Sequence, residues 1–108
     1  MVKVSVLYPN SETTKFDIDY YLAHHMPLVQ KLLGAALRGV FVEEGVSGGQ
    51  ADSSPACVAM GHLLFDTVED YRASFDPHAA AIVGDIPNYT NSQPTIQVSE
   101  VMLSPARK

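Results

Sequence analysis

The chain opens with alternating hydrophobic and polar residues, which predicts a β-strand. Val2, Val4, Val6 and Tyr8 fall on one face of this strand, and the turn residues at 9–11 end it. Three further strands are expected at about Leu37–Glu44, Cys57–Phe65 and Thr95–Leu103. The second of these is apolar on both faces, which is typical of a strand that is covered on both sides.

Two other stretches repeat their apolar residues with a helical period, and a proline interrupts each one. The first is expected to begin at an N-cap, Asp17, and to end at Gly34. Pro27 has no amide hydrogen and disfavours a helical conformation at Met26, so a kink or restart is predicted there. The apolar face of this helix is predicted to contain Ile18, Leu22, His25, Val29 and Leu32.

The second interrupted helix is expected to begin in a capping sequence, Thr67–Asp70, to restart at Pro77 and to end at Gly84. The order is therefore β-α-β-β-α-β within a single domain at 1–108. This is the ferredoxin-like pattern of the α+β class, a four-stranded antiparallel sheet with both helices on one face. The long polar loop Gly45–Pro55 is expected to be mobile, and whether it closes over a pocket is left open.

The sheet face opposite the helices lacks a cover in this arrangement. It keeps apolar residues from Cys57–Phe65, and from Val101 and Leu103 or their alternates. An uncovered apolar face of this size is a liability for a monomer. Burial contributes roughly 25 cal/mol per Å², so a second copy is the economical cover. The sequence predicts a homodimer joined sheet to sheet, with two-fold symmetry.

The composition mainly excludes several classes of partner and site. The chain has 108 residues, is 46% hydrophobic and carries a net charge of −5. Its seven Lys and Arg are scattered, which argues against nucleic acid as a partner. No apolar run approaches the ~18 residues of a membrane span, and the N-terminus does not resemble a signal peptide, so no membrane association and a cytoplasmic location are expected. No zinc-ligand spacing or nucleotide-binding motif occurs, and no cofactor or metal is predicted.

His25 is the first candidate for chemistry, because an imidazole stands where the helical stripe calls for an aliphatic side chain. One interpretation is a buried histidine that is bonded to a carbonyl freed near Pro27. The other is a general acid or base, or a ligand donor, at a pocket between helix and sheet. Tyr21 and Asp17 lie one and two turns earlier and are candidates to orient the ring, with a solvent-facing row of polar residues as the alternative. His24 is expected at the surface or at the pocket rim.

His62 is the second candidate, in the middle of an apolar strand and next to Gly61. A histidine there needs a polar partner or a ligand, and the glycine fits the close approach of a ligand or another chain. The alternative is a histidine of the core or of the dimer interface. Tyr8 and Tyr89 are candidates to line the same cavity, since tyrosine combines an apolar body with a polar tip. Plain packing is the alternative for each.

Several segments along the chain carry a family resemblance. They are Lys3–Pro9, Phe16–Val29, Met60–Asp66, Pro77–Ala80, Asp85–Thr90 and Ile96–Glu100. Together they resemble the EthD family, named for ethyl tert-butyl ether degradation. The resemblance implies the dimeric α+β barrel superfamily, in which two ferredoxin-like units pack sheet to sheet and often hold a small ligand between helices and sheet. His25 occupies the Tyr-Tyr-x-x-x-His-x-Pro position and His62 the Gly-His position.

The superfamily includes cofactor-free monooxygenases, polyketide cyclases, muconolactone isomerase-like proteins and haem-binding relatives. The family name records an association with a cytochrome P450 system that cleaves ethers, and does not specify a reaction. A proximal haem histidine is not identifiable in this sequence, so haem is not predicted.

Three functional hypotheses remain open. The first is a homodimer that binds a small apolar or aromatic, oxygen-bearing metabolite between helices and sheet. Its proton-transfer groups would be His25 and His62, in a lyase, isomerase or monooxygenase reaction, with Tyr8, Tyr21 and Tyr89 as binding residues. The second is a non-enzymatic ligand carrier or an accessory protein to an oxygenase. The third is a structural dimer whose histidines only satisfy core polarity.

Overall fold

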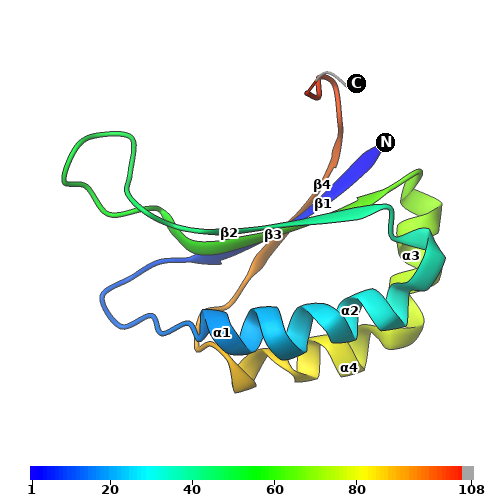
Figure 1. Ribbon diagram of the computed structural model, residues 1–108, viewed down its shortest axis with the longest axis horizontal. Helices are drawn as coiled ribbons and strands as arrows, with labels where there is room; N and C mark the ends of the chain where they lie inside the picture. The colour runs from blue at the N-terminus through cyan, green and yellow to red at the C-terminus, as the bar shows by residue number, and fades with distance from the viewer. Residues whose placement is uncertain (106–108) are drawn as a thin grey trace.

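The computed structural model describes residues 1–105 as a four-stranded antiparallel sheet with all helices on one face (Figure 1). In chain order the elements, with η marking short 3₁₀ or π turns, are β1 (Val2–Pro9), α1 (Ile18–Tyr20), η1 (Tyr21–His25), α2 (Met26–Leu33), η2 (Gly34–Ala36), β2 (Gly39–Glu44), β3 (Cys57–Phe65), α3 (Val68–Phe75), η3 (Asp76–His78), α4 (Ala79–Gly84), η4 (Ile86–Asn88) and β4 (Thr95–Glu100). The strand order is β2-β3-β1-β4, so the predicted ferredoxin-like fold is confirmed.

Strand register decides which side chains meet the helices. β1 pairs with β3 so that Val6 lies opposite Gly61, and Ser5 lies opposite His62. Because side chains alternate across a strand, these two pairs point to opposite faces of the sheet. Val4 and Tyr8 share the face of Val6 and are 1% exposed, so this face forms the core with the helices. The face that carries Ser5 and His62 has no helix over it (Figure 1).

The helix that contains Pro27 differs from the sequence prediction. Met26 keeps helical dihedral angles, φ −64° and ψ −42°, so the prediction that Pro27 removes it from the helical region is wrong. The chain instead forms a wider π turn at Tyr21–His25, where the Met26 N–H donates to the Tyr21 carbonyl. Such a turn inserts one residue into the helical ladder, and the helix continues across the proline without a break.

The π turn also rotates the buried face of the helix. Tyr21, His25 and Val29 are buried, whereas Leu22 is 50% exposed. The predicted stripe therefore holds for His25 and Val29, and Ile18 and Leu32 are partly buried against the core. The prediction that Leu22 belongs to the stripe is wrong. An extra residue in the turn replaces Leu22 by Tyr21 at the inward position before His25, and the two rings stack with centroids 5.3 Å apart.

The predicted helix ends are largely confirmed. The Asp17 carboxylate caps α1 by accepting the Tyr20 N–H at 3.1 Å, and the Thr67 hydroxyl accepts the Asp70 N–H at 3.0 Å. Gly34 ends α2 with a φ of +61°, which a glycine adopts without strain. The last strand is shorter than predicted, because β4 ends at Glu100.

The loop between β2 and β3 extends past the sheet on the side away from α1 and α2 (Figure 1). The helices, and everything packed between them and the sheet, therefore lie on the opposite side from this loop. Among residues 1–105, no helix is long and apolar enough to cross a membrane.

Candidate functional site

A cavity of about 60 Å³ lies between the sheet and the helices. Its wall is formed by β1, α2, β3, α4 and β4, together with neighbouring residues, and is almost entirely aliphatic or aromatic. The polar groups among the described lining residues are the hydroxyls of Tyr8 and Tyr21 and the imidazole of His25. An apolar chamber with a few convergent polar groups is the usual form of a small-molecule site.

His25 is held by a carboxylate that sequence analysis did not select. Its Nδ1 lies 2.9 Å from Oδ2 of Asp85, and the imidazole is 4% exposed. Asp85 follows directly after α4, whose C-terminus delivers it to the π turn. The prediction that Asp17 orients the ring is wrong, since its carboxylate is used as the cap of α1. The signal for Asp85 in the sequence is the segment Asp85–Thr90, which carries part of the family resemblance.

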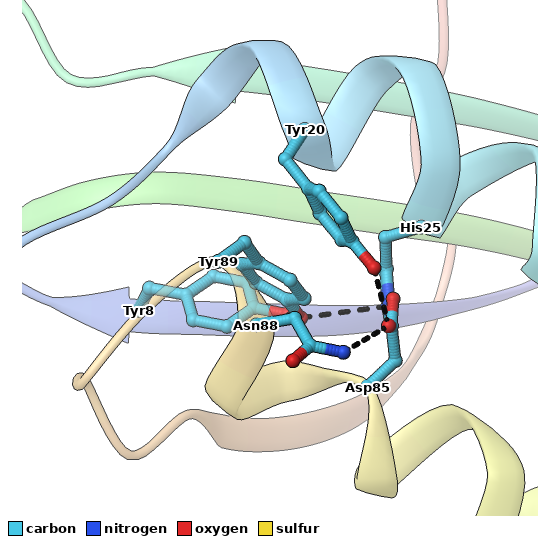
Figure 2. Close-up of polar contacts among 6 residues, drawn as sticks. All are labelled: Tyr8, Tyr20, His25, Asp85, Asn88 and Tyr89. Carbon is cyan, nitrogen blue, oxygen red and sulfur yellow. Dashed lines mark hydrogen bonds and ion pairs between the residues drawn. The ribbon is translucent and has the colours of Figure 1, made fainter.

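Asp85 is itself held in a fixed orientation. Its Oδ1 accepts the Tyr20 hydroxyl at 2.8 Å and the Asn88 side-chain amide at 2.9 Å, and Figure 2 shows these two contacts beside the contact to His25. Partial burial acts to raise the pKa of this carboxyl, but the hydrogen bonds from Asn88, His25 and Tyr20 together hold the pKa below its ordinary value. Asp85 is therefore a carboxylate near neutral pH and can only accept hydrogen bonds.

The charge state of Asp85 determines the tautomer of His25. Burial lowers the pKa of the imidazole more than the Asp85 carboxylate raises it, so the ring is neutral near pH 7. Because Asp85 only accepts, Nδ1 must carry the proton, and Nε2 keeps a free lone pair. The hydroxyl of Tyr89 approaches Nε2 at 3.4 Å, which is long for a hydrogen bond. Nε2 of His25 is therefore a hydrogen-bond acceptor beside the cavity whose present donor, the Tyr89 hydroxyl, is held only weakly.

Two tyrosines extend this arrangement toward β1. The hydroxyls of Tyr8 and Tyr89 are 2.6 Å apart (Figure 2). Burial raises the pKa of both phenols, so both are protonated at physiological pH. With the Tyr89 proton directed at His25, Tyr8 donates to Tyr89, and a continuous hydrogen-bonded chain joins Tyr8 to Asp85 through the imidazole. Hydrogen bonds in such a chain polarise one another, which strengthens the network and fixes the orientation of its groups.

Tyr21 closes one side of the site through a close contact with β3. Its hydroxyl lies so near Gly61 that a Cβ at this position would collide with it. The predicted close approach at Gly61 is therefore present, but the group that approaches is a side chain of the same chain. Burial raises the pKa of the Tyr21 phenol, as it does for its neighbours.

His62 lies outside this site. Gly61 and Leu63 face the cavity, so the intervening His62 points to the opposite face of the sheet. There its Nδ1 lies 2.8 Å from the Ser5 hydroxyl and its Nε2 3.0 Å from the Glu43 carboxylate. The prediction that His62 shares a cavity with Tyr8 and Tyr89 is wrong.

The structure does bring together the other predicted site residues. Tyr8, Tyr21, His25 and Tyr89 lie in one cluster, with ring centroids of Tyr89 and His25 4.7 Å apart. His24 is exposed and packs its ring against Tyr20, in keeping with the surface position that was one of the two expected for it. Within residues 1–105, no group of three His, Cys, Asp or Glu side chains is arranged to hold a metal ion.

The comparison with protein families agrees with this layout. The model of the EthD domain matches residues 10–93, a segment that contains His25, Asp85 and Tyr89. The chain belongs to the EthD family. The resemblance seen in the sequence segments is thereby confirmed.

Solved structures extend the comparison. An EthD-like protein from Ralstonia eutropha JMP134 is 41% identical, covering 97% of this chain and 95% of its own, with a TM-score of 0.93. An EthD family protein from Bacillus halodurans C-125 is 22% identical over 94% of this chain and 99% of its own, with a TM-score of 0.71. HapK from Hahella chejuensis is 10% identical over 100% and 99% of the two chains, with a TM-score of 0.63. The last two show the fold alone. A comparison with curated proteins gives no match.

Proposed function

We propose that this EthD family protein binds a small, neutral, apolar or aromatic metabolite that carries an oxygen, and that His25 exchanges a proton with it. The observation that carries the proposal is a neutral His25 beside an apolar cavity. The Asp85 carboxylate binds Nδ1 of this ring and leaves the Nε2 lone pair available. A carboxylate behind this ring fixes its tautomer and stabilises the imidazolium that forms on proton uptake.

The surroundings of His25 favour a neutral ligand. None of the described residues that line the cavity is Lys, Arg, Asp or Glu, so nothing there compensates a ligand charge. A buried charge without a partner is costly, and the Asp85 carboxylate behind the ring disfavours an anion further. A ligand hydroxyl can replace the long contact from Tyr89 and donate to Nε2, since that 3.4 Å contact is weak.

The arrangement suits an isomerisation that needs no cofactor. Nε2 removes a proton from a carbon next to a ligand carbonyl, so that His25 becomes an imidazolium and the C–H electron pair moves onto the carbonyl oxygen as an enolate. The imidazolium then returns this proton to another carbon of the enolate, which leaves the isomerised product and a neutral His25. The Tyr8 and Tyr89 hydroxyls stay protonated throughout, since burial raises the pKa of both phenols. Such proton transfer by a positioned side chain contributes roughly 10²–10⁴-fold to a rate.

The adjacent histidines provide a matched test of this proposal. Purified protein is screened by NMR against neutral phenols and hydroxy-enones, and any hit is assayed for turnover in His25→Gln and His24→Gln variants. His24→Gln removes an exposed imidazole next to the buried one and should change nothing. We expect turnover to fall at least about 100-fold in His25→Gln alone. Full activity of His25→Gln would refute the role of His25 in proton transfer, and binding without any turnover would leave a ligand carrier.

We also propose that a second copy covers the open sheet face. Phe41 lies on this face at 55% exposure, and Leu7, Met60 and Leu64 are only half-buried there. Sheet-to-sheet packing would remove these side chains from water. Sedimentation velocity at micromolar concentration should give a dimer for the native chain and a monomer for Phe41→Lys. A monomeric native chain would refute this assembly.

A further inference from the structure

A second hollow adjoins the cavity that contains His25. This outer hollow has a volume of about 310 Å³ and is formed mainly by the segment between α4 and β4, orange in Figure 1. The cavity and the outer hollow share three wall residues, Val83, Ile86 and Pro94. Val83 is 52% exposed, and Ile96 beside it in the cavity wall is 49% exposed, so the mouth of the cavity is an apolar rim that opens onto the outer hollow.

The inner cavity is too small for a whole ligand. An apolar cavity of about 150 Å³ accommodates benzene, and pockets that enclose metabolites have volumes of about 300–1,000 Å³. At about 60 Å³ the cavity beside His25 admits only the oxygen-bearing end of a ring. The rest of any ligand that reaches His25 must pass the rim and lie in the outer hollow.

The outer hollow has a different chemistry from the cavity. Half of its lining residues are apolar, and the other half are four consecutive polar residues, Thr90, Asn91, Ser92 and Gln93. The first three are occupied in holding the loop: Thr90 donates to the Lys15 carbonyl at 2.6 Å, Asn91 donates to the Thr13 carbonyl at 3.0 Å and Ser92 donates to the Pro9 carbonyl at 2.9 Å.

Gln93 differs from these three residues. It is exposed, and within residues 1–105 its side-chain amide has no hydrogen-bond partner. A primary amide offers both donors and an acceptor to a neutral polar group. None of the described residues that line the outer hollow is Lys, Arg, Asp or Glu. The hollow therefore offers hydrogen-bonding groups beside apolar side chains, and no charge.

We infer that the ligand of this site has two parts: an apolar or aromatic end with an oxygen that reaches His25, and an uncharged, hydrogen-bonding part, such as a sugar or an amide chain, that lies against Gln93. This inference rests on the proposed function, since it places the reacting end at His25. It adds that the outer hollow is the region that distinguishes between ligands with the same reacting end.

Two probes with the same phenolic end test the inference. Phenol reports on the cavity, and 4-hydroxyphenyl β-D-glucopyranoside adds an uncharged polar group in the position that faces the outer hollow. Dissociation constants are measured by calorimetry or by NMR titration of the amides of residues 20–30. We expect the glucoside to bind at least about tenfold more tightly than phenol, which corresponds to about 1.4 kcal/mol.

Two pairs of variants show which residues provide the additional affinity of the glucoside over phenol. Gln93→Ala should return the glucoside to the affinity of phenol and leave phenol unchanged, whereas Gln97→Ala on the open sheet face should have no effect. Val83→Trp at the rim should abolish glucoside binding, whereas Val46→Trp, in the loop between β2 and β3, should not. Because both valines are exposed, both variants should fold.

The outcomes separate this inference from the proposed function. If neither probe shifts the amides around His25, the proposed function fails and the inference fails with it. If phenol binds but the glucoside binds no more tightly, or keeps its affinity in Gln93→Ala, the inference alone is overturned. Tighter binding of the glucoside that is lost in Gln93→Ala and Val83→Trp, but not in the two controls, supports it.

Discussion

Substitution of Gly61 by alanine tests the packing that supports the site. The added Cβ would collide with the hydroxyl oxygen of Tyr21, whereas the ring carbon that bears this oxygen is 3.6 Å away, an ordinary contact. The obstacle is therefore one oxygen atom. The Tyr21 ring cannot move aside easily, because it packs against Phe16, His25 and Tyr89 with centroids 5.0–5.3 Å apart.

The expected cost is the balance of two effects. Overpacking a well-filled core costs about 1–3 kcal/mol. Alanine in a strand is favoured over glycine by about 0.5–1 kcal/mol, because it loses less backbone entropy on folding. Gly61→Ala should therefore destabilise the native chain by roughly 1–2 kcal/mol. In a Tyr21→Phe background the obstructing oxygen is absent, and the same substitution should be neutral or slightly stabilising.

Urea denaturation of the four chains in this cycle measures the coupling between the two sites. The coupling energy should lie at about 1–3 kcal/mol, the range found for residues in contact. Gly39→Ala is a suitable control, since its new Cβ would meet only the end of the flexible Leu64 side chain, at 3.3 Å. Equal costs of Gly61→Ala with tyrosine and with phenylalanine at position 21 would refute the close contact and with it this geometry of the site.

Three further predictions concern the polar groups of the site. Burial lowers the pKa of His25, so the unfolded chain takes up a proton at this residue more readily than the folded chain does. The stability that His25 contributes should therefore be complete above its ordinary pKa of 6.5 and should decline as the pH falls below that value. Urea denaturation between pH 7.5 and 5.5 should show this decline for the native chain and not for His25→Gln. Asp85→Asn should lower the pKa of His25 further, because the carboxylate no longer stabilises the imidazolium, and an NMR titration of the ring should show no such change in Asp17→Asn. Tyr8→Phe should cost about 0.5–1.5 kcal/mol of stability through the lost bond to Tyr89, and a value near zero in thermal denaturation would show that this bond is not formed.

The order of the elements could be predicted because local patterns encode it. Alternation marks β1, and the side chains at Asp17 and Thr67 accept the backbone N–H groups that mark helix starts, as predicted. The helix at Pro27 was predicted less well. Proline disfavours the standard helical turn, but the sequence does not say whether the chain responds with a kink or with a π turn. The packing of Tyr21 and His25 against the sheet stabilises the second response.

Some features of the candidate site likewise follow from the sequence, and others depend on the tertiary structure. The sequence by itself determined that His25 is buried and that tyrosines are available to surround it, because helical periodicity and amphipathic side chains are local properties. Only the tertiary structure decided that Asp85, 60 residues away, supplies the partner of His25. It also placed His62 on the other face of the sheet, since strand register assigns faces in alternation and a shift of one residue would have reversed the result. Contacts between distant segments depend on how whole elements pack, and a pattern along the chain does not contain them.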